Sequence, residues 1–338
     1  MDSLCQQAYL EDWDDLNREL EQTRLLSGLG AALDALRAHQ VESGFIQDEL
    51  QEFVRYQMPC PYQPGRFFSA QFNPARARRF SASSAVRDLS RRQVHNGCFL
   101  CRHNIFWQHQ GSELGFDLPL AGERYTAWMN PYPLLPGHTV VASKHHVPQH
   151  WKAPSAPSLF DLTGDLATLS SALPGWIGFY NGVGAGASIP HHLHFHFLPR
   201  ARGYEQMPLE TAARLQPDQT RVETVYPLTF LHWGGPIDSV LSSALAWIES
   251  WQRGSGSLDD ATVNIIACTA PDRPHLDLYI IPRHQTRSRA EGLRGVLGGF
   301  EAMGEIVCSL PDERRRLDNG DVDYGAIAAM LRSVPVAL

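Results

Sequence analysis

The first 60 residues combine a helical pattern of apolar positions with a clear end point. Residues 25–45 carry apolar side chains at helical spacing, and residues 46–58 repeat the pattern, so both stretches predict helices. The proline-rich stretch 59–65 ends them and indicates a boundary. Residues 66–72 then predict a strand that runs into a turn at Asn73-Pro74.

Beyond residue 120 the pattern changes to short apolar runs that alternate with amphipathic stretches. Strands are predicted over 124–131, 138–143, 176–181, 191–200, 261–268 and 275–283, and helices over 158–173 and 236–254. The order helix, strand, loop, strand therefore occurs twice. A polar connector near 214–224 separates the two cycles.

The two cycles also share residues at fixed spacing. Asn181 precedes His192 by eleven residues, as Asn264 precedes His275, and residues 192–200 then match 275–283 without gaps. Chance recurrence of apolar alternation is the competing explanation. We interpret the match as an internal duplication in an α+β protein whose second half is degenerate, because Asp277 stands where the first half has His194.

Composition limits the classes of function. The chain has 338 residues, 43% of them hydrophobic, which is long enough for two domains. Its net charge of −7 argues against sequence-independent binding of nucleic acid. The sequence predicts no signal peptide and no apolar run of the about 18 residues that a membrane helix needs. With only two of six cysteines closely spaced, no disulfide framework is expected, and we expect a cytoplasmic protein.

Three histidines alternate with apolar residues in the strand predicted over 191–200. Side chains of a strand alternate between its faces, so His192, His194 and His196 are expected on one face. Three imidazoles together favour a phosphate, a metal or a proton relay over a purely structural role. The preceding glycine-rich loop, which includes Gly186 and Ser188, is typical of loops whose N–H groups bind phosphate.

This segment resembles the histidine-triad motif. The longer pattern from Asn181 through Gly186 and Ser188 to His194 is similar to the active-site segment of galactose-1-phosphate uridylyltransferases and GDP-sugar phosphorylases. Residues 68–76, 98–101, 130–133 and 146–149 extend the resemblance over about 66–200, and they are even closer to a poorly characterised bacterial family related to these enzymes. The resemblance implies two histidine-triad-like halves, each an antiparallel sheet with helices.

The resemblance also implies a reaction. His194 would attack a nucleotide's α-phosphorus and carry a nucleoside monophosphate from a nucleotide sugar, or a dinucleoside polyphosphate, to phosphate or a sugar 1-phosphate. His196 and the loop amides would stabilise the developing charge. Transferases of this group usually have Gln at the third triad position, whereas His196 is typical of the hydrolase branch, so a hydrolase is the first alternative. A non-catalytic nucleotide-binding protein is the second.

A zinc site is expected beside the triad. The pair Cys98-x-x-Cys101 suits one edge of a tetrahedral zinc site that needs two further ligands, the alternative being a reduced thiol pair without metal. In uridylyltransferases a histidine and the first triad histidine complete such a site, which implies His146 and His192 here. His145 is the alternative to His146. With four protein ligands the zinc would be structural.

The remaining candidates bind the nucleotide. Asn73, Arg76, Asn181, Gly186 and Ser188 are predicted to contact it, although an isolated Arg76 is equally typical of a solvated surface. Further open phosphate-binding candidates are Arg78, Arg79, Arg200 and Arg283. We expect an N-terminal helical segment over 1–60, a catalytic half over 61–215 and a degenerate half over 216–338. A homodimer is left open.

Overall fold

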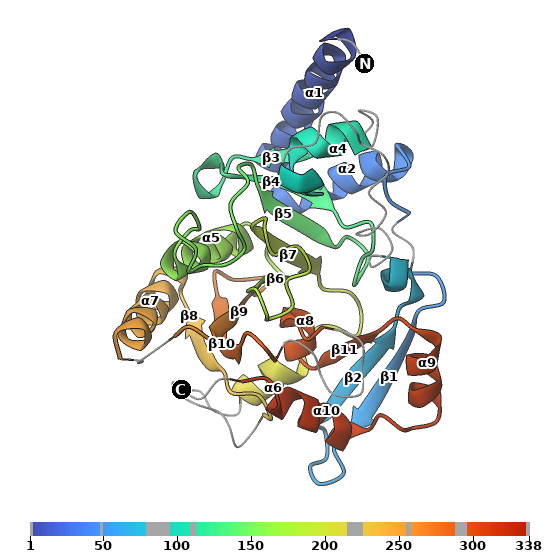
Figure 1. Ribbon diagram of the computed structural model, residues 1–338, viewed down its shortest axis with the longest axis vertical. Helices are drawn as coiled ribbons and strands as arrows, with labels where there is room; N and C mark the ends of the chain where they lie inside the picture. Colours follow the sequence, from blue (N-terminus) through green and yellow to red (C-terminus); the bar gives the residue numbers. More distant parts are fainter. Residues whose placement is uncertain are drawn as a thin grey trace.

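The computed structural model describes residues 3–47, 50–78, 95–108, 113–214, 226–254, 258–287 and 296–335 (Figure 1). Its strands are β1 (Val54–Pro59), β2 (Phe67–Phe72), β3 (Phe116–Leu118), β4 (Tyr125–Met129), β5 (Thr139–Ser143), β6 (Trp176–Asn181), β7 (His194–Pro199), β8 (Leu231–Gly235), β9 (Ala261–Thr269), β10 (Leu276–His284) and β11 (Glu305–Cys308). Its α-helices are α1 (Ser3–Ser27), α2 (Leu29–Glu42), α4 (Arg102–Gln108), α5 (Leu159–Ser171), α6 (Pro208–Arg214), α7 (Ile237–Gly254), α8 (Gly299–Ala302), α9 (Pro311–Asp318) and α10 (Tyr324–Arg332).

Two sheets organise the fold, which is α+β as predicted. The larger sheet has eight strands in the order β3-β4-β5-β7-β6-β9-β10-β8, and each neighbouring pair is antiparallel. The smaller sheet has the order β1-β2-β11. In it β11 runs parallel to β2, which differs from the purely antiparallel sheets that we expected. This pairing joins strands from opposite ends of the chain.

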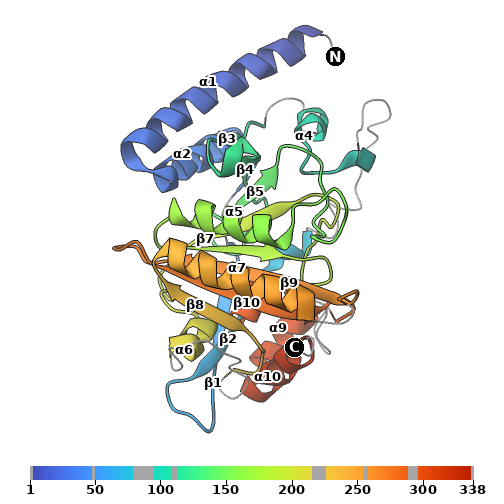
Figure 2. The same ribbon diagram turned by 90° about the vertical axis from the view of Figure 1, so that its left-hand side faces the viewer.

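The large sheet separates two hydrophobic cores. α5 and α7 lie side by side over one face (Figure 2), where they bury the side chains of Phe195 and Phe197. Leu198 belongs to the core on the other face of the sheet. The small sheet and α8–α10 lie on that side (Figure 1). This alternation confirms the expected two-faced strand for His194 and His196, which share the face of Leu198, while the phenylalanines fill the helical core. His192 was predicted on the same face but lies before the start of β7.

The two halves meet where β6 pairs with β9. Asn181 lies directly opposite Asn264 in this pairing, so the residues that define the repeat face each other across the junction. α5, β6 and β7 on one side correspond to α7, β9 and β10 on the other. The arrangement agrees with a duplicated chain whose halves form one continuous sheet.

The gapless match of the repeat is wrong in register, however. In the first hairpin Tyr180 pairs with Phe195, and the chain then opens into the glycine-rich loop. In the second hairpin Asn264 pairs with Ile281, whereas the gapless match predicts a partner close to Asp277. The reason is that β9 and β10 remain paired as far as Thr269 and Leu276. A short turn therefore replaces the loop, and β10 is displaced relative to its asparagine.

The helix predicted over 46–58 is also wrong. Residues from Val54 to Pro59 form β1, which pairs with β2 along its whole length, and residues 48–49 lie outside the described ranges. Pairing with a neighbouring strand overrides the weak helical pattern of this segment. Farther upstream, the helical stretch begins at Ser3 and is divided at Gly28, whose φ of 90° interrupts it between α1 and α2.

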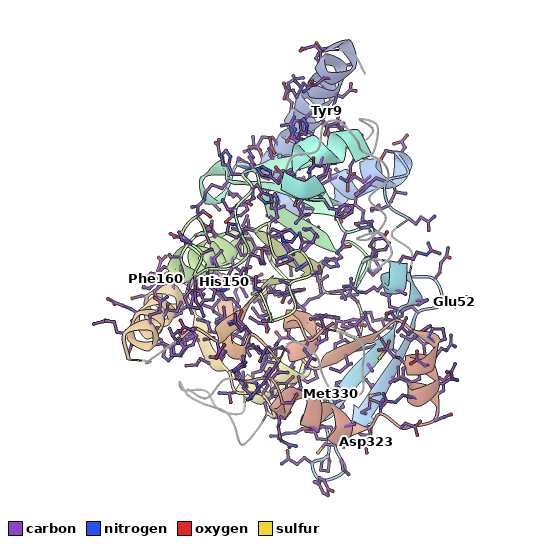
Figure 3. The ribbon with its side chains drawn as sticks, in the orientation of Figure 1. Tyr9, Glu52, His150, Phe160, Asp323 and Met330 are labelled. Atoms are coloured by element: carbon purple, nitrogen blue, oxygen red, sulfur yellow. The ribbon has the colours of Figure 1, made fainter. Side chains whose placement is uncertain are left out.

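α1 and α2 form a helical hairpin that packs against β3 and β4, with α1 projecting from the molecule (Figure 1). The fully buried Gln40 of α2 donates to the Leu114 carbonyl (2.7 Å) and accepts from the Met129 N–H (2.9 Å). The hydroxyl of Tyr9, labelled in Figure 3, donates to the Glu113 carbonyl (3.0 Å). These side chains satisfy backbone groups of the first half that would otherwise be buried without partners.

The other predicted elements agree closely with the structure. α5 begins after Ser158, which forms a capping box with Asp161. The polar connector predicted near 214–224 lies almost entirely outside the described residues, as does the boundary between 215 and 216, so the division into domains stays a prediction. Among the described helices, none is long and apolar enough to cross a membrane.

Candidate active site

β7 carries two of the three triad histidines side by side. His194 and His196 lie with their ring centroids 5.0 Å apart and their planes at 84°. His192 precedes the strand, and its ring turns toward the cysteine pair. The three histidines thus belong to two neighbouring clusters. His194 and His196 form an imidazole pair, and His192 lies with the two cysteines.

The hydrogen bonding of His194 leaves one ring nitrogen as a nucleophile. Nδ1 lies 2.8 Å from the carbonyl oxygen of His192, and because a carbonyl can only accept, Nδ1 must donate. The neutral ring therefore carries its lone pair on Nε2. Burial lowers the pKa of His194 to about 4, so the ring is neutral near pH 7. No partner for Nε2 is recorded in the described part of the chain.

Gln149 fixes the backbone on which His194 stands. Its side-chain oxygen accepts from the His194 N–H (2.8 Å), and its amide donates to the carbonyls of His194 (3.0 Å) and Asn181 (2.8 Å). Gln149 is fully buried, and the Tyr180 hydroxyl donates to its backbone carbonyl. Gln149 thereby joins the end of β6 to the start of β7, where the hairpin opens. It belonged to the resemblance but was assigned no role.

His196 is held by His138, which the sequence analysis did not identify as a site residue. The Leu134 N–H donates to Nδ1 of His138 (3.1 Å), and Nε2 of His138 lies 3.0 Å from Nδ1 of His196. Burial holds the pKa of His138 well below its usual value, so this ring is neutral and donates from Nε2. His196 must then carry its own proton on Nε2, as a donor. Its ring also stacks on Phe179.

Asn73 and Arg76 lie on the turn after β2. The Asn73 amide donates to the Pro133 carbonyl (2.9 Å), and Nη1 of Arg76 donates to the Tyr132 carbonyl (2.6 Å). Both residues are buried, which excludes the solvated-surface interpretation of Arg76. The charge of Arg76 contributes to lowering the pKa of His138, so the guanidinium lies within electrostatic reach of the imidazole cluster.

The glycines of the loop are required by the second half of the chain. A Cβ at Gly182 would lie 2.3 Å from the Thr262 hydroxyl oxygen, and one at Gly186 would lie 2.3 Å from Cα of Gly298. The loop therefore rests directly on the second half. Within the described residues, the N–H groups of Gly186 and Ser188 have no recorded protein acceptor. Their predicted contact with a phosphate stays a prediction.

Asn181 lies at the junction of the halves. Its side-chain oxygen accepts from the Asn264 amide (2.9 Å) and from the Gly299 N–H (2.7 Å).

The other arginines that the sequence offered as phosphate ligands have different surroundings. Arg200 forms a two-pronged pair with Glu210, and Arg283 is fully buried. Arg79 lies outside the described residues.

The four predicted metal ligands converge on one point. The ligand atoms of Cys98, Cys101, His146 and His192 all lie within 4.8 Å of one another. Sulfur-to-nitrogen distances are 3.4 Å from Cys98 to His192, 3.2 Å from Cys101 to His146 and 3.5 Å from Cys101 to His192. A tetrahedral zinc ion with ordinary bond lengths places such atoms about 3.6 Å apart.

The protonation of these residues also fits zinc. Nε2 of His192 lies 2.7 Å from the Ser143 carbonyl oxygen, to which it must donate, and this leaves Nδ1 free of hydrogen toward the sulfurs. The hydrogen bond between the two thiols lowers the pKa of Cys98 and raises the pKa of Cys101, so without a metal ion the pair shares one proton. His145 is exposed, and His146 occupies the cluster. The four residues therefore fit a structural zinc ion.

Fold and site together define the class. The chain is an α+β protein with a histidine-triad-like fold that presents a buried neutral histidine beside a Cys2His2 cluster. Residues 49–199 match a family described as Domain of unknown function (DUF4922). No curated protein matches the chain by sequence.

Crystal structures of yeast Ap4A phosphorylase Apa2 have a similar fold. The complex with Ap4A has a TM-score of 0.55 at 14% identity, over 90% of this chain and 97% of the Apa2 chain. The complex with AMP has a TM-score of 0.53 at 14% identity, over 94% and 96%. A third Apa2 structure has a TM-score of 0.54 at the same identity, over 90% and 94%. At this identity the likeness concerns the fold alone.

Proposed function

We propose that this chain is a nucleotidyltransferase that moves a nucleoside monophosphate through a covalent intermediate on His194. One observation carries the proposal: the hydrogen bond from Nδ1 to the His192 carbonyl, in a buried and neutral ring, leaves Nε2 as a lone-pair donor. An imidazole in this state is ready to attack phosphorus without first losing a proton.

In the first step Nε2 of His194 forms a bond to the α-phosphorus, and the bond from that phosphorus to the bridging oxygen of the leaving group breaks. The His192 carbonyl accepts from Nδ1 of the imidazolium and stabilises its charge. In the second step an oxygen of inorganic phosphate attacks the same phosphorus, the N–P bond breaks, and a nucleoside diphosphate leaves. Splitting the transfer lowers the barrier of each displacement.

Donors around His194 would bind the phosphoryl oxygens. His196 offers Nε2–H because His138 occupies its Nδ1, and the loop offers the N–H groups of Gly186 and Ser188. Arg76 would add a positive charge. Fixed donors of this kind stabilise charge that develops in the transition state. Zinc would hold His192, and hence the carbonyl that orients His194, without contacting the substrate.

For the donor we propose a dinucleoside polyphosphate first and a nucleotide sugar second. Apa2, whose fold is similar over nearly the whole chain, is named as an Ap4A phosphorylase and was crystallised with Ap4A and with AMP. The motif resemblance supports the nucleotide sugar instead. Both donors present an α-phosphorus with a phosphate leaving group, so the same histidine chemistry serves either.

A hydrolase is the second candidate, and the pair of His138 and His196 favours it. A histidine whose proton is set by a second buried histidine can orient water or pass a proton to a leaving group. In that case water would attack the nucleotidyl-histidine in place of phosphate. The product would be a nucleoside monophosphate.

Product analysis separates these two candidates. Purified protein would be incubated with Ap4A, and in parallel with GDP- and UDP-sugars, each with and without inorganic phosphate. We expect continuous formation of ADP and ATP from Ap4A only when phosphate is present, because without phosphate each chain releases one ATP and stays nucleotidylated. AMP formed at the same rate with or without phosphate would establish the hydrolase, and the absence of products from every donor would contradict both.

A further inference from the structure

A buried arginine of the second half lies directly behind the glycine-rich loop. The Arg283 side chain is fully buried, and its Nη1 donates to Oδ1 of Asn264 (2.7 Å) and to the Leu297 carbonyl (3.0 Å). A Cβ at Gly186 would lie 3.1 Å from the same Leu297 oxygen. The guanidinium and the loop therefore share one carbonyl group as their neighbour.

Asn264 carries this contact into the first half. While its oxygen accepts from Arg283, its amide donates to Oδ1 of Asn181 (2.9 Å) and to the backbone carbonyl of Ala185 (2.7 Å). All three polar contacts are thus satisfied in one orientation of the amide. Reversing this amide would place an N–H against the guanidinium and an oxygen against two acceptors. Arg283 consequently fixes which way Asn264 points.

The bond to Ala185 determines the direction of a loop N–H group. Because the peptide unit is planar and trans, its carbonyl oxygen and its N–H point in opposite directions. The Ala185 carbonyl points to Asn264 in the second half, so the N–H of Gly186 points away from the second half. Gly186 at φ 101° has no room for a side chain on the Gly298 side. The loop is therefore held from behind, with its amide directed outward.

The charge of Arg283 is unusual for a buried group. No carboxylate among the described residues forms an ion pair with it, and its Nε has no hydrogen-bond partner there. Burial lowers the pKa of Arg283 only to about 10, so the guanidinium stays charged near pH 7. A buried cation with one unsatisfied N–H is costly to the fold, and a pair of apolar residues would avoid that cost. The Glu301 carboxylate, which accepts from the Gly298 N–H (2.9 Å), acts on Arg283 electrostatically without pairing with it. An anion bound in front of the loop would add to this countercharge.

We propose that Arg283 and Asn264 are positioning residues for the phosphate: they orient the Ala185–Gly186 peptide and place a fixed positive charge behind the loop. The inference rests on the proposed function of His194, and it gives the catalytically degenerate half a role in the reaction. The second half lost its central histidine but supplies the support on which the phosphate-binding loop rests.

The test uses Asn264→Asp as its main variant. The new carboxylate would pair with Arg283, which keeps the fold, but it cannot donate to the Ala185 carbonyl, so the Gly186 peptide would turn. Arg283→Lys keeps the charge but replaces the planar guanidinium that donates to Asn264 and Leu297, and Arg283→Met removes the charge. Asn17→Asp is the matched control, because the Asn17 amide donates to the Gly115 carbonyl (2.9 Å) between α1 and β3, far from the loop in sequence.

Two quantities would be measured on the full-length variants: the Kd for AMP by calorimetry, and the single-turnover rate of labelling by radiolabelled Ap4A. We expect Asn264→Asp and Arg283→Met to label about 100-fold more slowly and to bind AMP about tenfold more weakly. Arg283→Lys should be intermediate, and Asn17→Asp should equal the wild type. Thermal unfolding of each variant would show that the loss does not follow stability.

Equal AMP affinity in Asn264→Asp and the wild type would overturn the inference, as would a wild type that binds no AMP. If the wild type binds AMP but never becomes labelled, the proposed function of His194 fails by itself. The AMP measurement then still decides the role of the loop, since a weaker affinity in Asn264→Asp supports it and an unchanged affinity contradicts it.

Discussion

His194 combines two properties that a free histidine in water lacks. The His192 carbonyl selects its tautomer, and burial removes its proton at neutral pH. His138 does the same for His196 by accepting from one side and donating to the other. The chemistry of the site therefore depends on hydrogen bonds made behind each imidazole, which set the tautomer that faces the substrate.

The neutral state of His194 should be visible in how kcat/KM falls at acidic pH. A histidine with an ordinary pKa would lose activity below about pH 6.5, whereas a pKa of about 4 keeps His194 neutral and nucleophilic well below that. We expect kcat/KM for Ap4A to stay constant from pH 7 down to about pH 5. A limb centred near pH 6.5 in the free enzyme would contradict the buried neutral histidine.

The same shift has a consequence for stability. The pKa of His194 in the folded chain lies below that in the unfolded chain, so the unfolded state takes up a proton first on acidification. The stabilising contribution is therefore present above about pH 6.5 and is lost progressively toward pH 4, amounting to about 3 kcal/mol in full. Denaturant unfolding at several pH values would measure it.

At the scale of elements, the Cys2His2 cluster brings together three segments that are far apart in the sequence. Cys98 and Cys101 precede α4, His146 follows β5, and His192 precedes β7. The same residue that completes the cluster, His192, supplies the carbonyl that orients His194. Loss of the metal should therefore loosen the start of β7 and, with it, the hydrogen bond that orients His194.

Neighbouring histidines provide a matched test of the metal site. His146→Ala removes a ligand, so we expect zinc content to fall from about one ion per chain to well below half, with a lower unfolding temperature. His145→Ala changes an exposed residue one position earlier and should retain the metal. Metal analysis after purification without chelators measures both. Equal zinc content in the two variants would remove His146 from the site.

At the scale of the whole molecule, the two halves form one sheet but contribute different parts of the site. The first half holds the histidines, and the second half supports the loop through Asn264 and Gly298. The small sheet adds β11 from the C-terminal part of the chain to β1 and β2 from the N-terminal part. The turn that carries Asn73 and Arg76 therefore follows a strand, β2, that is paired on both sides.

Elements with a strong local pattern could be predicted from the sequence, and those that depend on distant partners could not. The stretch 176–181 became β6 with the same bounds, because it is rich in apolar and aromatic residues and glycines flank it. The stretch 46–58 was misjudged, because β1 is fixed by its pairing with β2. Likewise the four-residue displacement of β10 follows from a turn whose length the repeat did not reveal.

The site shows the same limit. His192, His194 and His196 were evident from their spacing, and the ligand set implied by the resemblance converges in space. His138 lies 58 residues from His196, and Gln149 lies 45 residues from His194, so no local pattern connects them. The sequence predicts a strand that begins at His138, directly after Pro136-Gly137. A single histidine at the start of a strand does not indicate an active-site role, because it is also typical of ordinary strands.

Direct detection of the nucleotidyl-histidine tests the account's central claim. Wild-type protein, His194→Ala and the control His191→Ala, which changes an exposed neighbouring histidine, would be mixed with Ap4A labelled at the α-phosphorus and quenched within one turnover. We predict an acid-labile, base-stable label on the wild type and on His191→Ala. His194→Ala should carry no label and turn over at least about 10⁴-fold more slowly. A label of equal size on His194→Ala, or wild-type turnover of Ap4A without any label, would contradict the claim.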